Sequence, residues 1–296
     1  MEEYGGTVVY GLVGLKTHSK LALIVRREED GFCQYVHIGT GNYNPETARH
    51  YTDLSLITAN NEITSGVSEV FNFLTSQSKI PDFKSLLVGP VNLLSETLTL
   101  IRRELDLVKA GKPGLIIVKM NALFDAEIIE ALYEASQAGV SIKLMVRGVC
   151  ALRPGIKGLS ENIQVRSLVG RFLEHSRIFY FGNSGNPSVY VGSADWMDRN
   201  LRKRVEVLVP IKNIAIVKQI ETILSVYWDD NYSNRIMRSD GNYIARIPLP
   251  SETVTNAQEY FCGKSEERDP AKLISVFGNT LSLPPKEEKA DEQDLY

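Results

Sequence analysis

Two short segments of this 296-residue chain repeat the same order of residue types, in which a lysine or arginine stands two positions after a histidine. The first runs from His18-Ser19-Lys20 to Gly39-Thr40-Gly41-Asn42, and the second from His175-Ser176-Arg177 to Gly192-Ser193-Ala194-Asp195. Because side chains at i and i+2 of a strand point the same way, we expect each histidine beside its cation on an apolar strand. Two such half-sites, facing each other across an approximate twofold axis, would form one pocket suited to attacking and holding a phosphoryl group.

The distribution of charged residues along the chain indicates what kind of ligand it binds. The formal net charge is −3, but residues 264–296 hold five Lys or Arg against eight Asp or Glu, so residues 1–263 sum to zero. Within this neutral part the cations gather near the two histidine segments: Lys16, Lys20, Arg26 and Arg27 at the first, and Arg171, Arg177, Arg199, Arg202, Lys203 and Arg204 at the second. This placement favours an anionic ligand.

Composition excludes several classes of protein. The chain is 43% hydrophobic and 23% charged, and no apolar run approaches the roughly 20 residues of a membrane span. The first four residues lack the basic and apolar pattern of a secretory signal. Cys33, Cys150 and Cys262 are too few and too far apart for a disulfide framework or a cysteine-based zinc site. We therefore expect a cytoplasmic protein.

The apolar pattern predicts an α/β fold in two units, residues 1–85 and 86–263, followed by a charged, mobile tail over 264–296. In the first unit it predicts strands over 7–12, 20–27, 34–39 and 54–58 and a helix over 61–74. In the second it predicts helices over 93–108, 126–137 and 213–227, with strands over 115–120, 141–146, 163–168, 177–182, 188–194 and 205–210. Only 17 residues precede His18, whereas about 85 residues of the second unit precede His175. We therefore expect that the first unit lacks its opening elements and that the chain is the C-terminal piece of a longer protein.

The two histidines have the chemistry for phosphoryl transfer. A neutral imidazole attacks phosphorus near pH 7, and the phosphoramidate that it forms can pass the group on. Fixed Lys and Arg side chains stabilise the negative charge that the transition state spreads over its oxygens. A single His-x-Lys is a weak signal that a histidine packed in a strand would explain equally well, but two copies with matching Gly-(Thr/Ser) turns favour a site. We expect His37 to serve in packing and assign no role to His50.

This duplicated pattern resembles the phospholipase D superfamily, which carries two His-x-Lys motifs, each with a downstream Gly-Ser-x-Asn. The superfamily's aspartate, five residues after the lysine, would fall at Val25 and Gly182, and neither is acidic. The departure disfavours phosphodiester hydrolysis of the standard kind.

A closer resemblance extends over about residues 5 to 260. The segments that carry it are Gly14-Leu15-Lys16-Thr17-His18-Ser19-Lys20, His37-Ile38-Gly39-Thr40-Gly41-Asn42-Tyr43-Asn44, Thr47-Ala48-Arg49-His50-Tyr51-Thr52-Asp53, Val146-Arg147-Gly148, Leu173-Glu174-His175-Ser176-Arg177 and Gly192-Ser193-Ala194-Asp195-Trp196-Met197. Together they resemble the C-terminal catalytic half of the histidine-phosphorylating polyphosphate kinases. The resemblance implies two phospholipase D-like α/β units and reversible synthesis of polyphosphate from ATP, through a phosphohistidine and with magnesium.

Carried over by position, the resemblance implies roles for individual residues. His18 would be the phosphorylated nucleophile, and Tyr51, Arg147 and His175 would contact ATP. Tyr51 can stack on adenine, Arg147 can bind phosphate through two hydrogen bonds, and His175 can donate a proton to the departing ADP oxygen. The two motif cations, Lys20 and Arg177, would hold the phosphates. The family's magnesium-contacting positions precede His18 and have no counterpart here.

The resemblance also implies partners and leaves alternatives. The expected partners are ATP or ADP and inorganic polyphosphate, with a homo-oligomeric state and peripheral membrane association of the full enzyme, and with no nucleic acid. The alternative function is a catalytically inactive fragment that binds polyphosphate and needs its missing N-terminal part. A nuclease of the phospholipase D kind is a third reading, disfavoured by the missing aspartates and by the lack of base-stacking aromatic runs.

Overall fold

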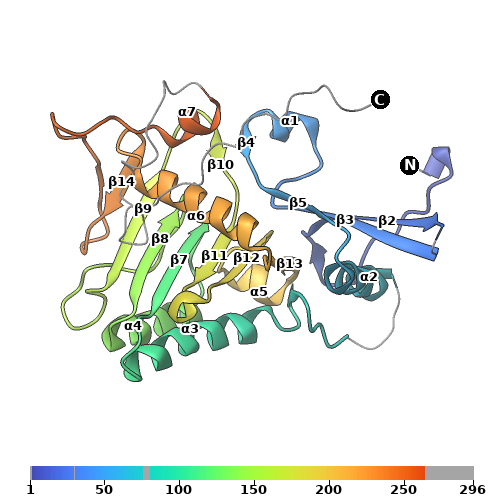
Figure 1. Cartoon of the computed structure of the whole chain (residues 1–296), viewed down its shortest axis with the longest axis horizontal. Coiled ribbons are helices and arrows are strands. Elements are labelled where there is room, and N and C mark those ends of the chain that lie inside the picture. Colours follow the sequence, from blue (N-terminus) through green and yellow to red (C-terminus); the bar gives the residue numbers. More distant parts are fainter. Residues whose placement is uncertain (1, 30, 76–80, 264–296) are drawn as a thin grey trace.

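The computed structural model describes residues 2–29, 31–75 and 81–263, and the segment 264–296, which we expected to be mobile, lies outside this range. The largest sheet is a ten-stranded mixed sheet with the order β1-β13-β12-β11-β7-β8-β9-β14-β15, in which β6 also pairs with β13 (Figure 1). Its strands are β1 (Lys16–Thr17), β6 (Leu87–Gly89), β7 (Leu115–Met120), β8 (Ser141–Val146), β9 (Ile163–Leu168), β11 (Ile178–Phe181), β12 (Ser188–Gly192), β13 (Arg204–Pro210), β14 (Asn234–Met237) and β15 (Tyr243–Ala245). The α/β fold class is confirmed.

Helices cover both faces of this sheet. Helices α3 (Leu93–Lys109) and α4 (Ala126–Ala138) pack on one face, and α6 (Ile214–Asp229) crosses the other (Figure 1). The side chains of β7 alternate between the two layers, since Ile116 and Val118 pack with α3 and α4 whereas Ile117 belongs to the core under α6. This double burial explains the nearly continuous apolar sequence of the central strands.

A smaller antiparallel sheet holds the first histidine segment. It consists of β2 (Lys20–Glu28), β3 (Gly31–Gly39) and β5 (Ser55–Thr58), and α2 (Asn61–Thr75) packs on one side of it. Val36 of β3 and Val67 of α2 share one buried cluster with Val207 of the large sheet. The two units therefore have a common core and hold their histidine segments in a fixed relation.

Two short parallel pairings join the units. Strand β1 of the first unit pairs with β13 of the second, and β4 (Tyr51–Thr52) of the first pairs with β10 (Leu173–Glu174) of the second. Helix α1 (Pro45–Ala48), capped by the Asn44 side chain, comes just before β4. The strand that directly precedes each histidine, β1 before His18 and β10 before His175, therefore pairs with a strand of the other unit.

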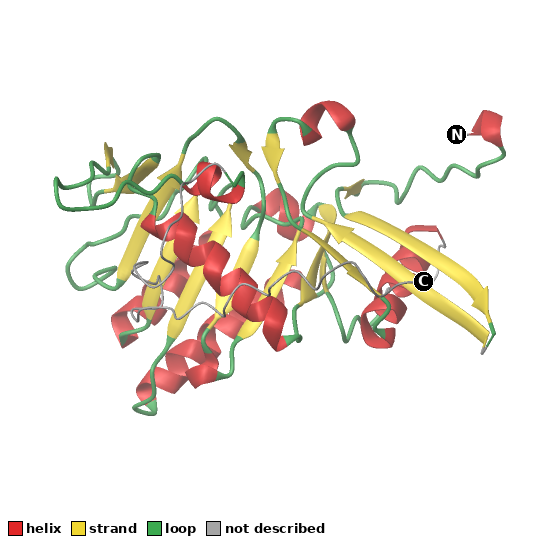
Figure 2. Cartoon of the chain, turned by 45° about the horizontal axis from the view of Figure 1, so that its top comes forward, coloured by secondary structure: helices red, strands yellow, loops and turns green. Residues whose placement is uncertain are grey.

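Most of the predicted elements are present, but the strand predicted over 7–12 is wrong. These residues form a largely exposed loop (Figure 2). No strand within the described ranges hydrogen-bonds to them, so their apolar residues have no sheet to complete. The pattern also missed the short elements β1, β4, β6, β10, β14 and β15, and the helices α5 (Asp198–Arg202) and α7 (Ala257–Phe261). Over the part of the chain that the structure describes, no helix is both long and apolar enough to span a bilayer.

Candidate active site

His18 lies in the link between β1 and β2, not within a strand as expected. The backbone N–H groups of His18 and Ser19 both donate to the carbonyl of Val205 in β13, each at 2.9 Å. This double hydrogen bond turns the histidine toward the next residue of β13, Glu206. The Nδ1 atom of His18 lies 2.9 Å from the Glu206 carboxylate, which is fully buried.

His175 is held by the same kinds of contact, with the roles of the two units exchanged. It lies between β10 and β11, and the N–H groups of His175 and Ser176 both donate to the carbonyl of Thr52 in β4, each at 3.1 Å. The residue after Thr52 is Asp53, whose Oδ1 lies 2.8 Å from Nδ1 of His175. The carboxylate partner of each histidine therefore comes from the other unit.

The Gly-(Thr/Ser) turns hold these carboxylates. Thr40 donates its hydroxyl to Asp53 at 2.6 Å, and Ser193 donates its hydroxyl to Glu206 at 2.5 Å. Asn200 also donates to Glu206, at 2.5 Å. Each turn thus orients its own unit's carboxylate toward the histidine of the other unit, which gives the second half of the duplicated motif a physical purpose.

The hydrogen bonds set the tautomers of the two rings. An ionised carboxylate only accepts, so the proton of neutral His18 stays on Nδ1, facing Glu206, and Nε2 keeps a free lone pair. In His175 the Nδ1 proton faces Asp53, while Arg177 Nη1, which can only donate, lies 3.1 Å from Nε2. Burial, assisted by Arg177 and opposed by Asp53, lowers the pKa of His175, so this ring is neutral at rest. The His18 side chain is 21% exposed and that of His175 10%, so His18 is the more accessible of the two.

The two motif cations reach back to their own histidines. Lys20 Nζ donates to the carbonyl of His18, and Arg177 Nη1 donates to the carbonyl of His175 at 2.7 Å. Arg177 also pairs with Asp195 at 3.1 Å and donates to the carbonyl of Thr40 in the first unit at 3.3 Å. Burial lowers the pKa of Lys20 to about 8, with Glu206 opposing the shift and Arg177 adding to it. The cations of both half-sites therefore lie near one another.

Arg147 and Tyr51, the other two expected site residues, lie around His175. Arg147 follows β8 and donates from Nε to Asn121 Oδ1 at 3.0 Å, and Asn121 in turn donates to the carbonyl of His175 at 3.2 Å. The Tyr51 ring lies 4.9 Å from the His175 ring, centroid to centroid. The structure thus brings Tyr51, Arg147, His175 and Arg177 together.

A cavity of about 420 Å³ opens beside this cluster. Tyr51 and Asp53 line it together with three aromatic side chains, Phe172, Tyr227 and Phe261. We call it the Tyr51 cavity. Its aromatic walls and its position beside His175 suit a flat ring attached to an anionic group.

Sequence reasoning missed both carboxylates of the site. Asp53 follows its hydrogen-bonding partner Thr40 by 13 residues, and Glu206 follows Ser193 by the same 13. This equal spacing of hydroxyl and carboxylate in the two copies was the available signal. The carboxylates lie far from their histidines in the sequence, so a search for an acid near each histidine could not find them.

The site is built from pairs of carboxylate with imidazole or cation. Across residues 2–29, 31–75 and 81–263, no group of three or more His, Cys, Asp or Glu side chains is arranged to hold a metal ion. Mg²⁺ that accompanies ATP is commonly bound by the substrate phosphates and only one or two carboxylates, so it does not require such a group.

Family models match two consecutive segments of the chain. Residues 1–80 match the family model for polyphosphate kinase C-terminal domain 1, and residues 86–258 match that for polyphosphate kinase C-terminal domain 2. The polyphosphate kinase of Synechocystis sp. is 50% identical over 278 residues, which is 93% of this chain and 38% of that protein. That of Lactiplantibacillus plantarum is 46% identical over 267 residues, 90% of this chain and 37% of the relative.

A solved structure agrees with the sequence matches. The crystal structure of polyphosphate kinase from Porphyromonas gingivalis superposes with a TM-score of 0.82 at 39% identity, covering 89% of this chain and 41% of that one. The chain thus spans about two fifths of the length of these relatives. With its two histidine units matched in order by both domain models, the chain belongs to the polyphosphate kinase family.

Proposed function

We propose that this chain carries the phosphoryl-transfer site of a polyphosphate kinase, with His18 as the residue that carries the phosphoryl group between ATP and polyphosphate. The observation that supports this most is the His18–Glu206 pair, which fixes the proton on Nδ1 and leaves Nε2 free on the more exposed of the two rings. The family membership of the chain supports the choice of substrates.

In the first half-reaction, the Nε2 lone pair of His18 attacks the terminal phosphorus of ATP. The bond from that phosphorus to the bridging oxygen breaks, and ADP leaves with the electron pair. The ring gains positive charge as the nitrogen–phosphorus bond forms, and the buried Glu206 carboxylate stabilises this charge through Nδ1–H. In the second half-reaction, a terminal oxygen of polyphosphate attacks the same phosphorus and the bond to Nε2 breaks, which restores the neutral ring.

The cations and Tyr51 bind the substrate in this proposal. Lys20, Arg147 and Arg177 contact the phosphate oxygens, where their charge opposes the negative charge of the transition state. The adenine ring stacks on Tyr51 in the Tyr51 cavity.

His175 serves as the acid that protonates the departing ADP oxygen. Its pKa is lowered at rest, so it first needs a proton. The negative triphosphate raises that pKa when it binds, because it favours the charged form of the ring. His175 then takes a proton on Nε2, in place of the Arg177 hydrogen bond, and donates it as ADP leaves.

The test of this function is the acid-labile, base-stable label that radioactive ATP leaves on a histidine. In an enzyme of the relatives' full length that carries this sequence, we expect the label on the wild-type protein and none on His18→Ala. His175→Ala should keep a labelled His18 but turn over roughly 10²-fold more slowly. Label that persists undiminished in His18→Ala would overturn the assignment.

Binding of polyphosphate without transfer is the second candidate. The cation cluster of Lys20, Arg147 and Arg177 favours it, since binding a polyanion requires no nucleophile. Polyphosphate binding with no labelled histidine, in the presence of magnesium, would select this candidate. The homo-oligomeric state, the peripheral membrane association and the cytoplasmic location stay predictions.

A further inference from the structure

A buried ion pair lies next to His175. Lys119 of β7 and Glu174 of β10 are 4% and 2% exposed, and Lys119 Nζ lies 3.0 Å from Glu174 Oε2. Lys119 also donates to the Ser176 hydroxyl at 2.8 Å and lies over the Tyr227 ring, 4.7 Å from its centroid. One ammonium therefore holds the residues on both sides of His175.

The Glu174 carboxylate joins two further parts of the chain. Its Oε2 accepts from the Thr52 hydroxyl of β4 at 2.8 Å, and its Oε1 accepts from Gln258 Nε2 of α7 at 2.8 Å. Lys119 and these hydrogen bonds keep the pKa of Glu174 below its usual value despite burial, so the group is ionised. A single carboxylate thus ties β4, β7 and α7 to the residue before His175.

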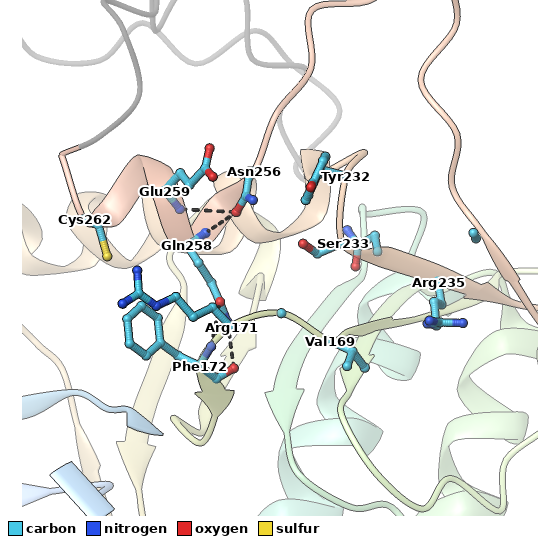
Figure 3. A pocket seen from close by; sticks show the side chains of 13 residues that line it. Val169, Arg171, Phe172, Tyr232, Ser233, Arg235, Asn256, Gln258, Glu259 and Cys262 are labelled. Carbon is cyan, nitrogen blue, oxygen red and sulfur yellow. Dashed lines mark hydrogen bonds between the residues drawn. The ribbon is translucent and has the colours of Figure 1, made fainter. Parts of the chain in front are cut away.

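Gln258 completes this arrangement from the far side. Its side-chain amide pairs with both backbone groups of Phe172, accepting from the N–H at 2.9 Å and donating to the carbonyl at 2.8 Å (Figure 3). Gly170 leaves the space for it, because a Cβ there would lie 2.6 Å from Gln258 Oε1. The start of β10 is therefore held by a side chain that takes the place of a neighbouring strand.

The geometry points to Glu174 as a positioning residue for His175, an inference that rests on the proposed function of that histidine. Thr52 stands between Tyr51, which contacts the His175 ring, and Asp53, which holds its Nδ1 proton. Strands β4 and β10 pair over only two residues each, and a slip of one residue would turn Asp53 to the other face. The Glu174–Thr52 hydrogen bond opposes this slip together with the backbone hydrogen bonds from His175 and Ser176 to Thr52, so Glu174 helps to fix the Asp53–His175 contact without touching the substrate.

Stability alone does not require a charged pair at this place. Apolar residues of similar volume often replace a buried ion pair without loss of stability. An apolar pair, however, has no directional bond to offer the Thr52 hydroxyl, the Ser176 hydroxyl or the Gln258 amide. The charged pair supplies directional hydrogen bonds, and these help to set the register of β4 against β10.

The test follows the Nδ1 protons of His18 and His175 by NMR in the ¹⁵N-histidine-labelled chain, with no substrate present. Glu174→Gln removes the charge and keeps the shape. Thr52→Val removes only the hydroxyl, and it decides the question if Glu174→Gln does not fold. Glu104→Gln is the matched control, because Glu104 is also fully buried, pairs with Arg103 at 3.0 Å and accepts backbone N–H groups of Leu115 and Asn183 away from the site.

We expect solvent exchange of the His175 Nδ1 proton to be at least about tenfold faster in Glu174→Gln and in Thr52→Val, because the hydrogen bond to Asp53 opens more often. The His18 proton should keep its rate in both variants, and Glu104→Gln should change neither histidine. An unchanged His175 rate in a folded Thr52→Val protein, or an equal change at both histidines, would overturn the inference. The measurement needs no turnover, so a failure of phosphoryl transfer to His18 would show separately in the labelling experiment.

Discussion

Asp53 of the first unit accepts the Nδ1 proton of His175 of the second unit at 2.8 Å. Glu206 of the second unit makes the same contact with His18 of the first. Neither unit holds a complete pair of histidine and carboxylate by itself, so the site exists only where the two units meet. Each histidine has its carboxylate partner in the other unit because the two short parallel pairings place a residue of one unit against the backbone of the other.

Replacing the His18 partner should slow the first chemical step. In an enzyme of the relatives' full length that carries this sequence, Glu206→Gln should reduce the rate of His18 phosphorylation by about 10²-fold, because a neutral amide does not stabilise the charge on the ring. Rapid quenching with labelled ATP measures the rate. Glu62→Gln, which alters an exposed carboxylate paired with Lys212, is the control. Equal rates for Glu206→Gln and the control would contradict the role of Glu206.

Lys20 should make stability depend on pH in the alkaline range. Its pKa is about 8 in the folded protein and takes the ordinary value of 10.5 in the unfolded chain. Between pH 8 and 10.5 the unfolded state therefore binds more protons, so this residue makes the free energy of unfolding rise with pH, and its full penalty applies below pH 8. Urea unfolding at the two ends of this window should show a steeper rise for wild type than for Lys20→Met. Identical slopes would refute the buried, perturbed state of this lysine.

Gly41 should tolerate no side chain beside Asp53. A Cβ at position 41 would lie 2.2 Å from Asp53 Oδ2, so Gly41→Ala must displace the carboxylate from His175. We expect a folded protein in which His175 loses its hydrogen bond, with polyphosphate synthesis by the full-length enzyme reduced by about tenfold or more. Circular dichroism checks the fold and steady-state synthesis checks the activity. Full activity of Gly41→Ala would contradict the role of Asp53.

Arg147 should contribute to binding through its charge. Within the described residues its guanidinium makes a hydrogen bond to Asn121 and no ion pair, so it is available to an anion. Arg147→Ala should weaken polyphosphate binding by about tenfold at low salt, and by less as salt screens the charge. Calorimetric titration at two salt concentrations measures both effects. A loss of affinity that does not depend on salt would show that Arg147 acts by packing instead.

The repeated motif residues could be predicted from the sequence. Most of the contacts that position them could not. His18, Lys20, His175 and Arg177 came from one local spacing that recurs, and the longer helices and strands came from apolar periodicity. The contacts of Asp53 and Glu206 depend on pairings between units that extend over only two residues each, and three of the strands involved, β1, β4 and β10, are no longer than that. Pairings of that length carry no periodic pattern. The equal spacing of hydroxyl and carboxylate in the two copies could point to Asp53 and Glu206, but not to the histidine that each one contacts.

The strand predicted over 7–12 shows a second limit. The run Thr-Val-Val-Tyr has strong strand preference, yet a strand forms only where a neighbour supplies its hydrogen bonds. Local preference cannot supply that neighbour. The Lys119–Glu174 pair shows a third limit, because a lysine inside an apolar run suggests an edge or an exposed face until its buried partner is known.

The nitrogen atom that carries the phosphoryl group reports directly on the His18–Glu206 pair. Because Glu206 holds the proton on Nδ1 of His18, the phosphoryl group must bind Nε2. ³¹P and ¹⁵N NMR of the phosphorylated full-length enzyme distinguishes the two nitrogens and, with His175→Ala, the two histidines. We expect a phosphoryl group on Nε2 of His18. A phosphoryl group on Nδ1 of His18, or on His175, would contradict this expectation.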